Sequence, residues 1–139
     1  MSLDKIRELT KVLDSREEEH LTVHEILQNV GDITDGYFDW EVGSEDEYLS
    51  DNFKLQLGYK PEEMPNKVSS WMGLIYEEDL DMLHQELDKH FNSKGEYPFQ
   101  VVCRYTHKSG EKIRILCRGK VIKWENGEPK RFVGVHIKL

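Results

Sequence analysis

Three segments with alternating apolar and polar residues occupy the last third of the sequence, over residues 97–107, 111–124 and 129–139. This period of two is typical of β-strands that bury one face. Asn126-Gly127 lies between the second and third segments and is a strong signal for a tight hairpin turn. The pattern therefore predicts an antiparallel β-meander in this part of the chain.

Each predicted strand carries apolar residues at every second position. In the first two strands these are Phe99, Val101, Cys103 and Tyr105, then Ile113, Ile115, Cys117 and Val121. In the third strand Val133, Val135, Ile137 and Leu139 alternate with Phe132, Gly134, His136 and Lys138. The four residues from Val133 to Leu139, with Val102 and Leu116, predict an apolar outer face. Leaving such a face in water costs about 25 cal/mol per Å², so we expect the N-terminal helix or a second subunit to cover it.

Two short strands and a short helix are predicted ahead of the meander. Residues 37–42 alternate and place Phe38, Trp40 and Val42 on one face, and a turn over 43–47 leads to a second strand at 48–50. Ser50 or Asp51 then caps a small helix that ends at Gly58.

Two further helices are indicated before the meander. Pro61 suits the first position of a second small helix, with Glu62 and Glu63 in its first turn. The clearest helix spans 77–91, with an acidic first turn and one apolar stripe made of Leu80, Leu83, Leu87 and Phe91. Helices segregated from an antiparallel sheet indicate an α+β fold.

Residues 3–30 predict a longer helix whose apolar stripe is made of Ile6, Leu9, Leu13, Val23, Leu27 and Val30. Arg16 and His20 occupy the remaining positions of that stripe, which weakens a coiled-coil assignment without removing it. The segment is either a surface helix or a helix that dimerises or relays a signal. We therefore divide the chain into a helix over 1–32 and a domain over 33–139.

Charge and composition exclude several classes of partner. The 139 residues carry a formal net charge of −8, which argues against non-specific binding to nucleic acid and to anionic membranes. No apolar run approaches the roughly 20 residues of a membrane span. Two cysteines are too few for a disulfide scaffold, and we expect a cytoplasmic location.

Five sequence stretches, taken in order, resemble a PAS domain of the branch with a Trp-containing first strand. They are GYFDWEV, LSDNFKLQLGYKPEE, WMGLIYEEDL, CRYTHKSGEKIRILCRG and NGEPKRFVGVHI. The resemblance implies a five-stranded antiparallel sheet with short helices on one face and an N-terminal flanking helix. It also implies that the Gly58-Tyr59 corner and its short helices form one wall of a pocket.

PAS domains are mainly sensory and dimerisation modules of bacterial signalling proteins, upstream of a histidine kinase or a GGDEF diguanylate cyclase. No GGDEF run or kinase nucleotide-binding region is found here, so we expect a sensor segment of a longer signalling protein. The family often continues from its last strand with Asp-Ile-Thr. Lys138 and Leu139 stand where Asp and Ile are expected, which argues against the usual Asp-mediated link to the next helix.

The resemblance also implies which side chains face the pocket. The candidates are Phe38, Trp40, Cys103, Tyr105, Ile115, Cys117 and His136. Tyr105 and His136 are the polar groups in this set, which suits a small, partly polar metabolite as ligand. His136 is either a polar contact for that ligand or is bonded to neighbouring backbone, and the two cysteines are ligand contacts or inert core residues.

No cofactor is indicated with confidence. Light-sensing relatives need a reactive cysteine on the helix after the Gly-Tyr corner, and residues 61–80 contain none, so covalent flavin chemistry is excluded and non-covalent flavin is disfavoured. Haem-binding relatives can take a histidine ligand from the long helix, where this chain has His84 and His90. Haem is disfavoured because a histidine on such a helix is usually solvated or half-buried. Cys103, Cys117, His107 and His136 lack the spacing of a zinc site.

We expect no catalysis by this domain, because a nucleophile elbow, a phosphate-binding glycine loop and a paired-carboxylate site are all missing from the sequence. The expected function is sensing of a small ligand, with a homodimer formed through the N-terminal helix and the outer sheet face. The alternatives are a ligand-free dimerisation spacer and, more distantly, a haem-binding PAS sensor or a small-molecule enzyme with a cone-like α+β fold. A buried acid with a raised pKa facing a tyrosine would favour the enzyme.

Overall fold

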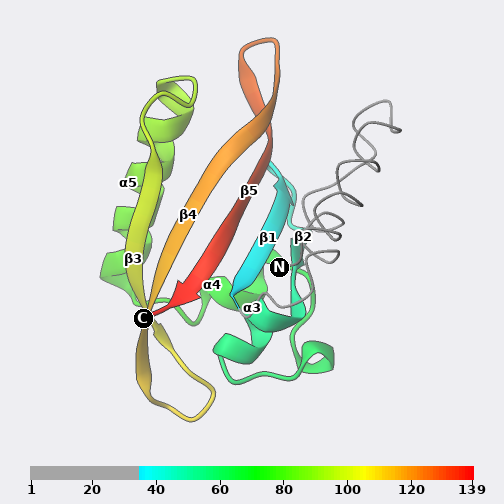
Figure 1. The fold of residues 1–139 in the computed structure, drawn as a ribbon, viewed down its shortest axis with the longest axis vertical. Coiled ribbons are helices and arrows are strands. Elements are labelled where there is room, and N and C mark those ends of the chain that lie inside the picture. The colour runs from blue at the N-terminus through cyan, green and yellow to red at the C-terminus, as the bar shows by residue number, and fades with distance from the viewer. Residues whose placement is uncertain (1–34) are drawn as a thin grey trace, which may run out of the picture. The chain divides into compact units, whose positions relative to one another are not determined.

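The computed structural model describes residues 35–139, which form a five-stranded antiparallel sheet with helices over one face (Figure 1). The strands lie in the order β2-β1-β5-β4-β3. Their bounds are β1 Gly36–Glu41, β2 Glu47–Leu49, β3 Phe99–Thr106, β4 Lys112–Glu125 and β5 Glu128–Lys138. The sheet and meander predicted from the sequence are confirmed.

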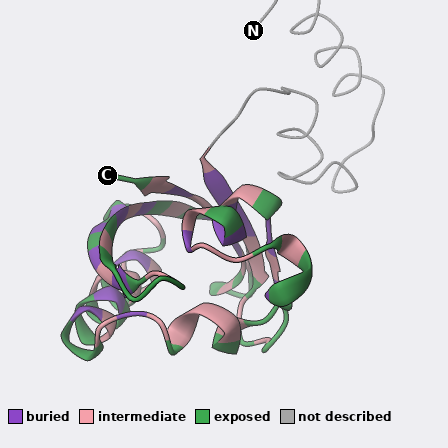
Figure 2. Cartoon of the chain, turned by 90° about the horizontal axis from the view of Figure 1, so that it is seen from below, coloured by how far each residue is buried: buried purple, intermediate pink, exposed green. Residues whose placement is uncertain are grey.

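Helices connect β2 to β3, and in order along the chain they are α3 Asp51–Gln56, the 3₁₀ turn η1 Pro61–Glu63, α4 Val68–Met72 and α5 Glu77–Asn92. Within residues 35–139, no helix has the length and apolarity that a membrane span requires. Figure 2 shows that buried residues gather along the strands and on the helix surfaces next to them. The core is therefore a single layer between the sheet and its helices.

The strand register places the predicted inner residues on one face. Phe38 lies opposite Gly134, Cys117 lies opposite His136, and Cys103 lies opposite Ile115. All of the predicted inner residues of β3 are buried, with Cys103 and Tyr105 each 1% exposed. The long helix is also confirmed: Leu83 of its stripe is buried, and Leu80, Leu87 and Phe91 pack against the core.

The corner after α3 is closed by a glycine in the left-handed region. Gly58 has a φ of +88°, and a Cβ at this position would collide with the ring of His107. Lys108 ties the same corner to the β3–β4 hairpin, because its N–H donates to Leu57 O at 2.9 Å and its Nζ pairs with Glu63 at 2.5 Å. The helix expected from Pro61 is only one 3₁₀ turn.

Ser50 is the N-cap of α3 and links that helix to the sheet. Its Oγ accepts from the N–H of Phe53 at 3.2 Å and from the N–H of Tyr37 at 2.9 Å. Ser50 was one of the two predicted caps.

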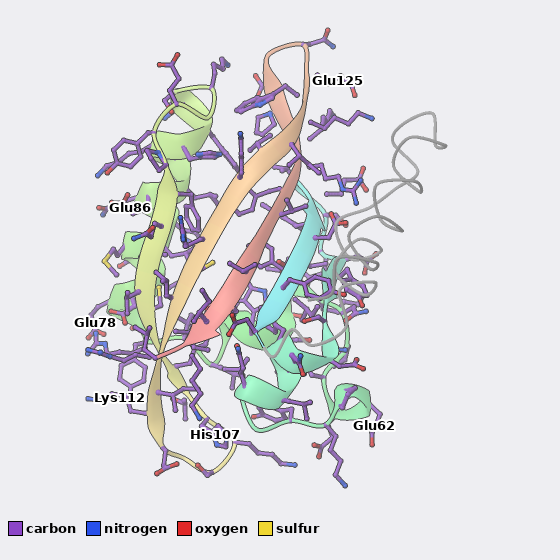
Figure 3. All side chains as sticks on the ribbon, in the orientation of Figure 1. Glu62, Glu78, Glu86, His107, Lys112 and Glu125 are labelled. Carbon is purple, nitrogen blue, oxygen red and sulfur yellow. The ribbon has the colours of Figure 1, made fainter. Side chains whose placement is uncertain are left out.

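Asp79 in the first turn of α5 fixes that helix to β3. Its carboxylate accepts from Arg104 Nε at 2.9 Å, from Arg104 Nη2 at 2.7 Å and from the Arg104 backbone N–H at 2.6 Å. The guanidinium beside it holds the pKa of Asp79 below its ordinary value. The other acids of the helices lie at the periphery, as Figure 3 shows for Glu62, Glu78 and Glu86.

The turn predicted at 43–47 ends one residue earlier than expected, because Glu47 is the first residue of β2. It pairs with Trp40 of β1 and therefore points to the inner face. The β1–β2 turn is held against the start of α4, since Val68 N–H donates to Glu45 O at 2.8 Å and Lys67 pairs with Asp46 at 2.6 Å. This correction places a carboxyl group in the core.

Candidate functional site

A cavity of about 110 Å³ lies between the inner face of the sheet and the helices α4 and α5. Its lining consists of Phe38, Trp40, Glu47, Phe53, Val68, Trp71, Met72, Leu83, His84, Leu87, Phe99, Tyr105, Cys117, Phe132 and His136. The strand residues of this set are mostly buried. Val68, Trp71 and Met72 of α4 are half-buried and His84 of α5 is exposed. The cavity therefore opens between α4 and α5.

Aromatic rings from the sheet form its floor, and two glycines make room for them. A Cβ at Gly119 would lie 2.5 Å from Cζ of Phe132, and a Cβ at Gly134 would lie 2.5 Å from Cζ of Phe38. These rings are 5.7 Å apart, and Phe99 meets Phe132 edge-on at 5.3 Å. The rings fill much of the space that the layers enclose, which explains the modest volume that remains.

Glu47 is the one carboxyl group among the described residues of the lining. It is only 6% exposed, and its Oε1 accepts a hydrogen bond from Trp71 Nε1 at 2.7 Å. Burial raises the pKa of Glu47 to about 7, despite the opposing hydrogen bond from Trp71. Near neutral pH this group is therefore divided between its neutral and charged forms.

His136 closes the sheet side of the cavity as a neutral ring. It stacks on Phe53 with a centroid distance of 4.2 Å and meets Phe38 and Tyr105 edge-on. Burial lowers the pKa of His136 to about 3, and its Nδ1 is buried without a hydrogen-bond partner. The side chain is thus not tied to neighbouring backbone through this nitrogen, which was one of the two predicted alternatives.

Two other groups on this side of the molecule also lack partners. The hydroxyl of Tyr105 and Oε1 of Gln56 are buried and unbonded, although Gln56 Nε2 donates to His136 O at 3.0 Å. Burial raises the pKa of Tyr105 and of Cys117 well above their ordinary values. Both groups are therefore neutral, and the unpaired hydroxyl of Tyr105 is enclosed in the wall of the cavity.

The structure brings five of the seven predicted pocket residues to the cavity: Phe38, Trp40, Tyr105, Cys117 and His136. Cys103 and Ile115 are buried in the adjoining core but are not part of the lining, and the thiol of Cys103 contacts Asp79 O at 3.8 Å. Sequence reasoning missed Glu47, which it had assigned to a turn. The available signal was its position two residues before Leu49, which gives both residues the same face of a strand.

The two histidines of α5 lie in different surroundings. His84 is at the rim of the cavity, whereas His90 is 1% exposed and has both ring nitrogens engaged. Nδ1 of His90 is 2.7 Å from Tyr97 O, and its Nε2 accepts from the N–H of Val121 at 3.1 Å. The expectation of a solvated or half-buried His90 was wrong, because the histidine joins the end of α5 to β4.

The size of the cavity limits what it holds without rearrangement. A protein cavity of about 150 Å³ binds benzene, so 110 Å³ corresponds by proportion to about four or five non-hydrogen atoms. A flavin ring system or a haem is several times larger than this volume. Among residues 35–139 no three His, Cys, Asp or Glu side chains are grouped as metal ligands.

Comparison with known families gives a match to the PAS fold over residues 46–136. That range covers more than half of the chain and includes all of the lining except Phe38 and Trp40. A search of curated proteins gave no match.

Three solved structures illustrate the similarity of fold. A sensory box histidine kinase/response regulator from Burkholderia thailandensis is 26% identical with a TM-score of 0.69, covering 81% of this chain and 82% of that one. The N-terminal domain of a diguanylate cyclase with a PAS/PAC sensor from Marinobacter aquaeolei is 15% identical with a TM-score of 0.62, covering 75% and 94%. The LOV domain of a blue-light activated histidine kinase from Erythrobacter litoralis is 12% identical with a TM-score of 0.57, covering 77% and 97%.

The resemblance seen in five sequence stretches, the five-stranded sheet with its short helices and the family match over residues 46–136 agree with one another. The chain belongs to the PAS fold family.

Proposed function

We propose that this chain is the sensory PAS domain of a bacterial signal-transduction protein and that its cavity binds a small ligand. The observation that carries the proposal is the cavity itself, which Glu47, Tyr105 and His136 line among aromatic side chains, with the unbonded Tyr105 hydroxyl and His136 Nδ1 enclosed in its wall. Buried polar atoms without partners are costly. A ligand that reaches these atoms through a small shift of the cavity wall and supplies their hydrogen bonds would stabilise the folded state.

The output that would follow is a histidine kinase or a diguanylate cyclase on the same longer chain. Similar structures come from both classes of protein. Signal transfer would proceed by a population shift, in which the ligand favours one packing of the sheet and its flanking helix over another. We infer a cytoplasmic location from the two cysteines, both of which are free and buried.

We infer that the domain is not an enzyme, although the cavity contains the arrangement expected of the rival. Glu47 is a buried acid with a raised pKa, and Tyr105 lines the same cavity. The two side chains share no hydrogen bond, and burial raises the pKa of Tyr105, which makes its hydroxyl a poor proton donor. The presence of Glu47 and Tyr105 in one cavity is equally explained if both side chains bind a ligand.

We also infer that the ligand is neither a flavin nor a haem. Covalent flavin chemistry needs a cysteine on the helix that follows the Gly58 corner, and the two cysteines lie instead on β3 and β4. For haem, the relevant histidines are those of α5: His90 uses both ring nitrogens in protein contacts, and His84 lies at the exposed rim of the cavity. The volume argument applies to both groups.

We propose a homodimer that uses the outer sheet face and the N-terminal helix predicted over residues 3–30, which lies outside the described residues. Val102 is 40% exposed and Leu139 is 58% exposed, with Leu116, Val135 and Ile137 half-buried beside them. Leu13→Glu places a charge in the predicted apolar stripe and should raise the dimer dissociation constant at least tenfold in sedimentation velocity. Sedimentation identical to that of the parent at matched concentration would contradict this dimer.

A thermal-shift screen of small amines, heterocycles and carboxylic acids tests the sensor proposal. A ligand at a hundredfold excess over its Kd adds about 2.7 kcal/mol to the free energy of unfolding. Cys117→Leu fills the cavity from its β4 wall and should abolish the shift. Val102→Leu, on the outer face of β3, is the matched control and should retain it.

A ligand-free dimerisation spacer is the second candidate, and the small volume of the cavity favours it. In that case no compound of any class shifts the parent, and Cys117→Leu raises the melting temperature simply by filling a void. This outcome would overturn the sensor proposal.

A further inference from the structure

Glu47 is a buried carboxyl group that forms no salt bridge with any cationic side chain among residues 35–139. The only hydrogen bond of its carboxyl group within residues 35–139 comes from Trp71 Nε1 to Oε1, so Oε2 has no donor among those residues. Although it is unbonded, Oε2 is not fully enclosed by protein atoms, so it faces accessible space. Buried carboxylates in proteins are normally paired with a cation or a metal, and the nearby pair of Asp39 with Arg131 uses that arginine already.

The rest of the cavity wall also favours positive charge. Seven of its residues are Phe, Trp or Tyr, and none of the described lining residues is Lys or Arg. Aromatic rings attract cations through the negative potential over their faces. The indole N–H of Trp40 donates to Ser44 O at 2.7 Å and the indole of Trp71 donates to Glu47, so both N–H groups are occupied. Trp40 and Trp71 therefore contact the cavity with the carbon atoms of their rings rather than with a free N–H group.

We propose that the cavity binds a small organic monocation, a methylated ammonium of about four or five non-hydrogen atoms, whose charge pairs with Glu47 and whose methyl groups contact the aromatic walls. This inference rests on the proposed sensor function and names the class of ligand that the sensor reads. An anionic ligand has no cation to meet in this lining, and its charge would lie beside that of Glu47.

Binding of a cation is linked to release of the Glu47 proton. Because the pKa of Glu47 is about 7 in the free protein, affinity for a permanent cation should be about tenfold higher at pH 8 than at pH 6. Other titratable groups face Glu47 or the same cavity. They are Asp39 on β1, Glu45 before β2, His84 on α5, Tyr105 on β3, Cys117 on β4 and His136 on β5.

The test compares three probes of similar size and different charge. Tetramethylammonium is a cation at every pH, tert-butanol is neutral, and propionate is an anion at both pH values used. Dissociation constants for the full chain are measured at pH 6 and pH 8 from the NMR signal of the Trp71 indole N–H, with the Trp124 indole N–H as internal reference. Glu47→Gln keeps an acceptor for Trp71 and removes the charge, and His84→Gln tests whether the rim histidine causes the pH effect.

We expect tetramethylammonium to bind the parent and His84→Gln about tenfold more tightly at pH 8 than at pH 6. We expect Glu47→Gln to lose at least tenfold in affinity at pH 8 while its affinity for tert-butanol stays unchanged. The pH comparison in the parent retains its force if Glu47→Gln fails to fold. Equal affinity for tert-butanol and tetramethylammonium, or cation binding that survives in Glu47→Gln, overturns the inference and leaves the sensor function standing. If no probe binds and the broader screen also fails, the sensor function falls as well.

Discussion

Two buried histidines lie in the core, one on α5 and one on β5, and they differ in what their ring nitrogens contact. His90, at the end of α5, is 1% exposed and bonds to Tyr97 O and to the N–H of Val121. Because a backbone N–H only donates, Nε2 of His90 is the acceptor and Nδ1 carries the proton. His136, on β5, is 4% exposed and leaves its Nδ1 unbonded.

The difference separates a structural region from a candidate site. Around His90 each polar group has a partner, and the ring joins a helix end to a strand. Around His136 the unbonded atoms of Tyr105 and Gln56 lie close by, and the cavity lies beside them. Most buried polar groups in folded proteins are bonded, so the unbonded ones mark the region where the proposed ligand would complete the contacts.

The largest expected effect comes from making the same substitution at both histidines. His90→Phe leaves the N–H of Val121 and the carbonyl of Tyr97 without partners, and each loss costs about 1–3 kcal/mol. We therefore expect a loss of about 4 kcal/mol in the free energy of unfolding at pH 8. His136→Phe keeps the stack on Phe53 and should cost less than about 1 kcal/mol. Urea unfolding of both variants checks the pair, and equal losses would remove the distinction between the two regions.

Glu47→Gln gives the next largest effect and depends on pH. Burial raises the pKa of Glu47 to about 7 from an ordinary value of 4.5, so the folded protein keeps a proton that the unfolded chain releases. The stabilisation from this proton is complete below pH 4.5 and is lost as the pH rises through 7. The variant, which has no such proton, should gain about 2.5 kcal/mol relative to the parent between pH 5 and pH 8.

Urea unfolding at these two pH values measures the change. Glu125→Gln is the control, because Glu125 lies exposed at the end of β4 (Figure 3) and should give the same difference from the parent at both pH values. A Glu47→Gln difference that also stays constant with pH would place the charge of Glu47 in contact with solvent.

The sequence was sufficient to predict the strands and the inner face of the sheet, because the period of two is clear in β3 and in much of β4. Phe99, Cys103 and Tyr105 face inward as expected, and Leu83 anchors the stripe of α5. Local chemistry also predicted Ser50 as a cap and Gly58 as a left-handed corner. These features depend on neighbours in sequence or on simple alternation.

The polar content of the cavity could not be predicted in the same way. Glu47 reads as part of a hydrophilic turn until its pairing with Trp40 and its bond to Trp71, 24 residues away, are known. His90 reads as a surface residue until the end of β4 supplies the N–H of Val121. In both cases the hydrogen-bond partner is far away in the sequence, so the periodicity of apolar residues does not predict the contact.

The smallest expected effect concerns the response of His136 to acid, which runs opposite to that of Glu47. Burial lowers the pKa of His136 to about 3 from an ordinary value of 6.5. Between these pH values His136 is protonated in the unfolded chain and neutral in the folded protein. The stabilisation is complete above pH 6.5 and is lost as the pH falls toward 3, which amounts to about 2 kcal/mol by pH 5. His136→Phe should therefore gain about 2 kcal/mol on the parent between pH 8 and pH 5, the reverse of the direction expected for Glu47→Gln.

Urea unfolding at pH 8 and pH 5 reports the change, and His84→Phe at the exposed rim serves as the matched control, with a difference from the parent that stays constant. If His136→Phe also shows a constant difference, the ring accepts its proton in the folded state, and some group or water within reach of Nδ1 already satisfies it. The region around His136 would then be as complete as that around His90.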